Sequence, residues 1–155
     1  MAISKKVKDE MLQRFQDQYG IMKPALHYNS PFELMIAVIL SAQCTDERVN
    51  VITARMFPRL NTPEKMGALT QEEMEAEIRD CGLYHAKAKN LLGAAARVCD
   101  VYGGQVPKTL EELITLPGVA RKTANVVLFG AFGINEGLAV DTHVKRISYR
   151  LGLTE

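Results

Sequence analysis

The sequence has no apolar run long enough to cross a membrane. Its longest, "LMIAVILSA" from Leu34 to Ala42, is well short of the ~20 residues that a membrane-spanning helix needs. The N-terminus, "MAISKKVKDEMLQRF", carries charged residues where a signal peptide has an apolar segment. The sequence therefore predicts no membrane partner and a cytoplasmic location.

Cysteine is also scarce. Cys44, Cys81 and Cys99 are odd in number and lack the spacing of a metal site. This argues against a disulfide framework and against a zinc site. We expect reduced, partly buried thiols without a catalytic role and no metal held by this chain.

The net charge of +1 gives no evidence for nucleic-acid binding by itself. Basic residues outnumber acidic ones only in the second half of the chain, and a surplus this small is typical of a solvated surface. The 47% hydrophobic content is enough for one sizeable core. Charge and composition alone therefore predict a globular protein and no particular partner.

No stretch alternates apolar and polar residues as a half-buried strand would. Helix starts, in contrast, recur as a Ser or Thr followed by Pro or by a Glu three residues later, at Ser30–Glu33, Thr62–Pro63, Thr70–Glu73 and Thr109–Glu112. Glycine stops are expected at Gly82 and at Gly103-Gly104. The predicted fold class is all-α, with short helices joined by tight turns.

Two predicted helices, about Pro31–Ala42 and Ala124–Phe132, are apolar on nearly every side. Such helices belong at the centre of a bundle, with amphipathic helices around them. The first ~20 residues predict one amphipathic helix, and "AVDTHVKRISYRLGLTE" begins another. No low-complexity linker or clear repeat divides the chain.

The segment "LPGVARKTANVVLFGAFG" follows a short capped helix and predicts a helix-hairpin-helix. Gly118 allows the turn and a close approach of its backbone to a partner, and the next helix begins near Ala120. Free N–H groups at that helix start favour an anion such as a DNA phosphate, with Arg121 and Lys122 adding positive charge. The alternative is a plain Pro-Gly turn between two packed helices.

Lys122 stands in the first turn of this helix, where the positive end of the helix dipole disfavours its protonated form. We therefore expect a lowered pKa, which would make the amine a nucleophile. Val126 and Phe129 follow on the same face and are expected to supply apolar surroundings. The alternative is an exposed lysine that binds phosphate.

Asp141 follows an apolar triplet and precedes a helical pattern, so it is first of all a predicted N-cap. A capping carboxylate that faces a cleft could also stabilise a developing cation or activate an attacking group. Lys145, Arg146 and Arg150 follow at helical spacing. They either follow a phosphate backbone or face water.

Taken together, "YNSPFELMIAVILSAQCTD", "GLYHAKAKNL", "GGQVP", the hairpin segment and "AVDTHVKRISYRLGL" resemble endonuclease III, a bifunctional DNA glycosylase and AP lyase of the helix-hairpin-helix superfamily. The resemblance runs from about Tyr28 in the same order and spacing. It implies a helical barrel with an incomplete second lobe. Residues 1–28 would be the N-terminal helix and connection of that lobe, 29–133 the barrel with its hairpin, and 134–155 the start of the returning helix.

The resemblance also implies the activity. A base excision repair enzyme of this kind removes oxidised pyrimidines and cleaves the strand by β-elimination through a lysine Schiff base. Lys122 of "ARKTA" matches the lysine that attacks C1′ of the flipped nucleotide, and Asp141 of "VDTH" matches the assisting aspartate. The adenine-mismatch glycosylases, which are the nearest alternative, carry serine where this chain has Lys122.

Further residues match the family's DNA contacts. Gln43 and Leu83 correspond to side chains inserted into the duplex where the flipped nucleotide has left, and Gly118, Ala120 and Arg121 belong to the hairpin that binds phosphate. Without the family, Leu83 would be a core residue at a helix entry and Gln43 a polar cap on a buried helix. Ala120 stands where the family has the hairpin's second glycine, which we expect to restrict the backbone's approach to phosphate slightly.

The implied partner is double-stranded DNA that contains a damaged pyrimidine or an abasic site, and the full-length protein is implied to be a monomer. Its [4Fe–4S] cluster is held by a four-cysteine loop, and this chain ends at Glu155 without those cysteines. The chain is therefore interpreted as a truncated form that holds no cofactor. The alternatives are a non-catalytic or weakly active DNA-binding fragment and a plain helical interaction domain.

Overall fold

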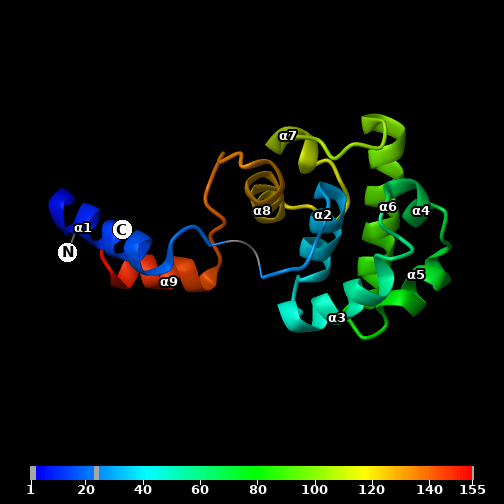
Figure 1. The fold of residues 1–155 in the computed structure, drawn as a ribbon, viewed down its shortest axis with the longest axis horizontal. Helices are drawn as coiled ribbons and strands as arrows, with labels where there is room; N and C mark the ends of the chain where they lie inside the picture. The colour runs from blue at the N-terminus through cyan, green and yellow to red at the C-terminus, as the bar shows by residue number, and fades with distance from the viewer. Residues whose placement is uncertain (1–2, 23–24, 155) are drawn as a thin grey trace. The chain divides into compact units, whose positions relative to one another are not determined.

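The computed structural model describes residues 3–22 and 25–154. Its helices are, in chain order, α1 (Lys5–Tyr19), α2 (Pro31–Leu40), α3 (Asp46–Met56), α4 (Pro63–Gly67), α5 (Gln71–Ile78), α6 (Tyr84–Tyr102), α7 (Leu110–Leu113), α8 (Arg121–Phe132) and α9 (Thr142–Arg150) (Figure 1). No strand occurs in the two described ranges, and the all-α prediction is confirmed.

The chain forms two compact units. Pro24–Leu138 make up the first, called here the core unit, and Met1–Lys23 together with Ala139–Glu155 make up the second, called here the terminal unit. The core unit contains α2 to α8, and the terminal unit contains α1 and α9. The assignment of residues 1–28 and 134–155 to a larger second lobe stays a prediction.

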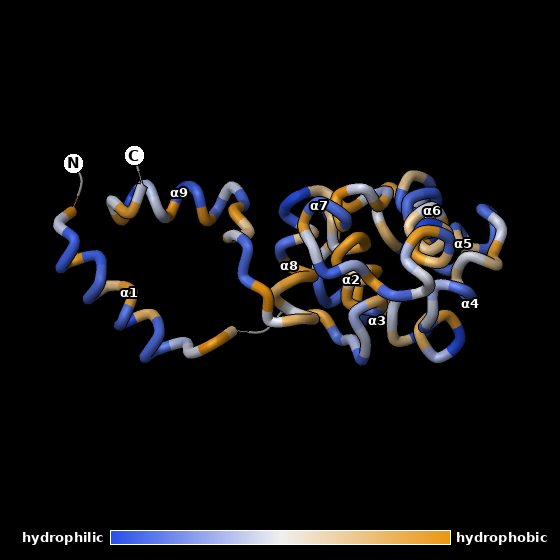
Figure 2. Tube along the Cα trace, turned by 90° about the horizontal axis from the view of Figure 1, so that it is seen from above, coloured by the Kyte–Doolittle hydropathy of each residue, from blue (hydrophilic) through white to orange (hydrophobic). Residues whose placement is uncertain are grey.

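Helix α2 is the centre of the core unit. Every residue from Phe32 to Leu40 is buried, because α3, α6 and α8 all pack against this helix. Figure 1 shows α2 between α8 and α6, and the apolar colour of α2 in Figure 2 matches this position. The prediction of a central apolar helix here is confirmed.

Helix α8 differs from its prediction. It buries one face, through Ala124, Asn125, Val127 and Leu128, against α2 and α7. The opposite face stays open, and the Phe129 side chain on it is 45% exposed. The expectation of a second fully central helix is therefore wrong, because α8 has packed neighbours on one side only.

The predicted helix starts are confirmed by side-chain caps. The hydroxyl oxygens of Ser30, Thr62, Thr70 and Thr109 each accept a hydrogen bond from the backbone N–H three residues on. Only Thr70 completes the reciprocal capping box, since the Glu73 carboxylate accepts from its backbone N–H. The Glu33 carboxylate accepts instead from the N–H of Asn29, at 2.6 Å.

One of the two predicted glycine stops is wrong. Gly103 ends α6 in the left-handed conformation, with φ of 60° and its N–H bonded to the carbonyl of Val98. Helix α5, however, ends at Ile78, four residues before Gly82. Its C-cap is Arg79 in the right-handed region, so no glycine is needed there.

The terminal unit contains no buried side chain among its described residues. Ser4 caps α1 and Asp141 caps α9. A long hydrogen bond of 3.5 Å joins the Lys8 ammonium to the carbonyl of Leu153. Apolar and polar residues alternate in colour along both helices in Figure 2, so this unit has an amphipathic pattern but no core of its own.

Candidate active site

The turn between α7 and α8 requires its glycine for two reasons. Gly118 has φ of 77°, a conformation that costs little only for glycine. A Cβ added to Gly118 would also lie 2.9 Å from Cβ of Asn90 on α6. The backbone of the hairpin therefore packs closely on α6, and the predicted helix-hairpin-helix turn is present.

Ala120 has a φ of −87° and a ψ of 172°, extended values that any residue adopts, so the turn does not require glycine at this position. The expectation that its side chain slightly restricts the approach of the backbone to phosphate stays a prediction.

Helix α8 begins without a side-chain cap, since Ala120 is its N-cap and offers no acceptor. Among the described helices only α6, which begins after Leu83, shares this property. Ala120, Arg121 and Lys122 are all exposed. The start of α8 therefore presents backbone N–H groups and two cations to solvent, which is the arrangement that binds anions.

A pocket of about 320 Å³ lies beside Lys122. It brings Lys122 together with Gln43, although the two residues were predicted from separate motifs. Val126 contributes to the wall as expected, whereas Phe129 is not part of it. The lining residues are Ala25, Leu26, Val38, Ser41, Ala42, Gln43, Asp46, Lys122, Thr123 and Val126.

Sequence reasoning missed three polar residues of this pocket, namely Ser41, Asp46 and Thr123. In the sequence, Asp46 follows the N-cap Thr45 and has the appearance of an ordinary acidic residue in the first turn of α3. Nothing in the local pattern distinguishes it from such a residue. In the fold, Asp46 lines the same pocket as Lys122.

Asn50 of α3 fixes, through two hydrogen bonds, the backbone that carries Ala25 and Leu26 in the pocket wall. Its Oδ1 accepts a hydrogen bond from the N–H of His27 at 2.8 Å, and its Nδ2 donates to the carbonyl of Ala25 at 3.0 Å. These two bonds fix the bend that supplies Ala25 and Leu26 to the lining. The pocket is thus built on fixed backbone.

Gln43 and Leu83 share an unusual backbone. They are the only non-glycine residues with positive φ in the described part of the chain, at 55° and 60°. Both are exposed, Leu83 to 61%. Their loops adjoin, because a Cβ added to Gly82 would lie 3.7 Å from the carbonyl oxygen of Gln43. Two side chains therefore project from neighbouring strained turns.

The alternatives weighed for these two residues do not hold. Leu83 is not a core residue, since most of its side chain faces solvent. The C-cap of α2 is Ser41 and not Gln43. Backbone strain at exposed residues is typical of functional sites.

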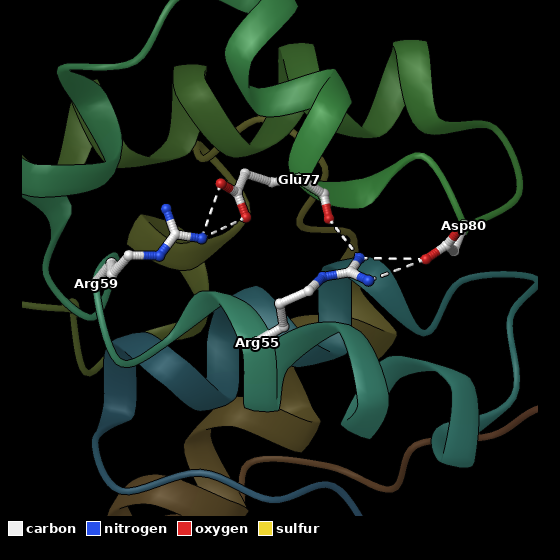
Figure 3. Close-up of polar contacts among 4 residues, drawn as sticks. All are labelled: Arg55, Arg59, Glu77 and Asp80. Atoms are coloured by element: carbon white, nitrogen blue, oxygen red, sulfur yellow. Dashed lines mark hydrogen bonds and ion pairs between the residues drawn. The ribbon is translucent and has the colours of Figure 1, made fainter.

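Arg55 of α3 and Arg59, in the turn that follows this helix, hold the segment that leads to Leu83 (Figure 3). The Arg55 guanidinium donates to Oδ2 of Asp80 at 3.2 Å and to the carbonyl of Glu77 at 3.0 Å. Arg59 donates to both carboxylate oxygens of Glu77 at 2.9 Å. Each pair is partly exposed and contributes little to stability alone, but together they tie the end of α5 to α3 and to the turn that follows it.

Asp141 lies in the terminal unit, and its Oδ1 accepts a hydrogen bond from the N–H of Val144 at 2.8 Å. The N-cap interpretation is therefore confirmed. Lys122 lies in the core unit, and the assistance of Asp141 in its chemistry stays a prediction. Lys145, Arg146 and Arg150 of α9 are exposed.

The three cysteines are free, and within residues 3–22 and 25–154 no group of three or more His, Cys, Asp or Glu side chains could hold a metal ion. The described residues therefore do not fit the iron–sulfur cluster that the resemblance implies for longer relatives. No described helix is long and apolar enough to cross a membrane.

Comparison with known proteins shows the family of this chain. The family model described as "HhH-GPD superfamily base excision DNA repair protein" matches residues 36–155. Endonuclease III of Synechocystis sp. is 48% identical over 100% of this chain and 71% of its own length. Endonuclease III of Bacillus subtilis is 46% identical over 92% of this chain and 64% of its own length.

Among solved structures, a trapped endonuclease III–DNA covalent intermediate, described as an estranged-adenine complex, matches with a TM-score of 0.92 and 45% identity. The match covers 99% of this chain and 71% of that one. This chain thus spans about two thirds of the length of the relatives that it matches. It belongs to the HhH-GPD superfamily of base excision DNA repair proteins and is a homologue of endonuclease III.

Proposed function

We propose that the chain binds double-stranded DNA and acts there as an N-glycosylase for oxidised pyrimidines with AP lyase activity, Lys122 being the nucleophile. The observation that carries the proposal is the pocket in which Lys122 and Gln43 meet, beside the uncapped start of α8. Its volume of about 320 Å³ is at the lower end for small organic ligands and suits a single nucleoside.

The proposed reaction follows from the attack of the Lys122 amine on the anomeric carbon, C1′, of the nucleotide. The lone pair of the Lys122 Nζ attacks C1′ of a nucleotide turned into the pocket, and the glycosidic bond breaks as the base leaves and takes up a proton. The amine loses its protons as the sugar ring opens, which leaves a Schiff base. Loss of a proton from C2′ then allows the C3′–O bond to break, so that the 3′ phosphate leaves, and water releases the lysine.

Other residues have supporting roles in this proposal. The N–H groups at the start of α8, with Gly118, Ala120 and Arg121, bind the DNA backbone. Gln43 and Leu83 fill the space that the extruded nucleotide leaves, one by hydrogen bonding and one by stacking. Asp141 supports the attack by Lys122 through its negative charge. The iron–sulfur cluster has no part in these steps. A DNA substrate also agrees with the cytoplasmic location predicted from the sequence.

Binding without catalysis is the second candidate, and the exposure of Lys122 favours it. An exposed lysine at a helix start binds phosphate well without any nucleophilic role. The two candidates differ in whether a covalent imine forms.

Borohydride reduction separates them, because it converts a Schiff base on abasic DNA into a permanent protein–DNA link. The wild-type chain is expected to give an adduct on a denaturing gel, and Lys122→Gln is expected to give none while still binding DNA. Arg121→Gln is the matched control: it removes the neighbouring cation, so it should weaken DNA binding at low salt and reduce the salt dependence of binding, but keep the adduct. An adduct at the normal rate from Lys122→Gln would mean that another amine is the nucleophile. Binding without any adduct from the wild type would favour the second candidate.

A further inference from the structure

Lys87 is buried, although lysine is among the residues least often found inside a protein. It lies on α6 and is only 4% exposed. Its Nζ donates one hydrogen bond of 2.9 Å to the carbonyl of Leu40 and one of 3.0 Å to Sγ of Cys81. Cys81 is itself buried, and its thiol lies 3.5 Å from the same carbonyl.

Packing alone does not explain a lysine here. An ammonium taken out of water costs free energy unless other groups compensate it, and the ion pairs of the described residues do not include Lys87. A methionine would fill a similar volume without this cost. What the lysine adds is a set of donors and a charge at the negative, C-terminal end of α2.

These donors join two segments that are distant in sequence. Leu40 is the last residue of α2, three positions before Gln43, and Cys81 stands two positions before Leu83. Gln43 and Leu83 are the two exposed residues with strained backbones described above. Lys87 therefore connects, from inside the core unit, the bases of both turns.

The arginine contacts at the surface hold only one of these two segments, the one that leads to Leu83. Arg55 of α3 and Arg59, in the turn after this helix, hold Asp80 and the end of α5 from the solvent side. Neither reaches the turn that carries Gln43. The buried Cys81 thiol reaches the Leu40 carbonyl only at 3.5 Å, and the Lys87 ammonium adds the two shorter hydrogen bonds that hold the bases of both turns together.

We propose that Lys87 is a positioning residue for DNA recognition: by holding the Leu40 carbonyl and the Cys81 thiol together, it sets the separation of Gln43 and Leu83 and thereby the preference for abasic over intact DNA. This inference rests on the proposed function, since it takes Gln43 and Leu83 as the residues that enter the duplex. Lys87 contacts neither DNA nor the reacting atoms.

The test compares the affinity of the full chain for a duplex containing a tetrahydrofuran abasic analogue with its affinity for the same duplex intact. Lys87→Met is expected to lower this ratio about threefold to tenfold. Val98→Ala is the matched control, because Val98 is fully buried on the same helix but far along it from both turns. It should lower the melting temperature and leave the ratio unchanged.

A second pair of variants covers the case in which Lys87→Met fails to fold. Cys81→Ala removes the partner on the Leu83 side and should lower the ratio, whereas Cys81→Ser keeps an acceptor for Lys87 and should preserve most of it. Amide hydrogen exchange gives an independent measure: residues 41–44 and 79–83 should exchange faster in Cys81→Ala than in Val98→Ala.

The outcomes separate this inference from the proposed function. A wild-type chain without preference for abasic DNA overturns both. A wild-type preference that survives unchanged in Lys87→Met and Cys81→Ala overturns the role of Lys87 and leaves the proposed function intact. An equal loss of the ratio in Val98→Ala also overturns it, because the effect would then follow stability alone.

Discussion

Replacing Leu83 with glycine is expected to leave the stability of the core unit nearly unchanged while damaging DNA recognition. Leu83 has φ of 60° and ψ of 33°, which is the left-handed region, and it precedes the first turn of α6. Glycine adopts this region without steric cost because it has no Cβ, whereas leucine is strained there. The usual rule that glycine destabilises a helix boundary does not apply at this position.

The magnitude follows from three terms. Full burial of a leucine contributes about 1.5–3 kcal/mol, and Leu83 is 61% exposed, so the loss of its side chain costs about 1 kcal/mol. Glycine adds about 0.7 kcal/mol of unfolded-state entropy against folding. Relief of the left-handed strain returns about 1–2 kcal/mol. The net change for Leu83→Gly is therefore a destabilisation of at most about 0.7 kcal/mol.

Leu83→Ala keeps the strain and loses the same contacts, so it should be about 1 kcal/mol less stable than Leu83→Gly. Urea unfolding measures this order directly. Leu91→Ala, on the buried face of the same helix, is the reference for a core position and should lose about 2–5 kcal/mol.

In binding assays, both Leu83 variants should lose preference for abasic over intact duplex and keep the salt-dependent binding of intact DNA. A loss of 2 kcal/mol or more of stability in Leu83→Gly, comparable to a core deletion, would refute the argument. Equal losses of affinity on both DNAs would refute the wedge role.

Two further predictions concern a cap and a thiol. Asp141→Ala should destabilise α9 by about 1 kcal/mol, seen as lost helical circular dichroism, while Asp141→Asn keeps the cap and so isolates any loss of trapping rate. Burial, with a smaller contribution from its hydrogen bond to Cys81, raises the pKa of the Cys44 thiol. The native chain therefore binds the Cys44 proton more tightly than the unfolded chain does. The protonated thiol thus stabilises the fold at pH values below the ordinary thiol pKa of about 8.5, and this stabilisation is lost as the pH rises above it. Iodoacetamide should accordingly alkylate Cys44 more slowly in the native chain than in urea at pH 8, and equal rates would contradict the raised pKa.

The helices were predictable because their signals are local. Ser30, Thr62, Thr70 and Thr109 mark starts through bonds that span three residues, and these formed as expected. The misjudged end at Gly82 has a tertiary cause. The chain there turns toward α6 and packs beside the turn of Gln43, a requirement that no local pattern reveals.

The site was predictable where a motif carries its own chemistry and not where tertiary packing supplies it. Lys122 and Gly118 stand in a hairpin whose turn and helix start can be read from the sequence. Asp46 and Lys87 could not be found in this way. Each has an ordinary place in a helical pattern, as a first-turn acid and as a surface cation, and only the fold brings one to the pocket and the other into the core.

The departures from ordinary folding rules gather around one part of the core unit. The two strained non-glycine residues of the described chain, Gln43 and Leu83, adjoin each other, and Gln43 shares its pocket with Lys122. The two helices without side-chain caps begin directly after Leu83 and Ala120. Elsewhere the described helices are capped in the usual way. Backbone strain costs stability, so its occurrence at Gln43 in the Lys122 pocket and at the adjoining Leu83 is consistent with the DNA-binding role that we propose for this surface.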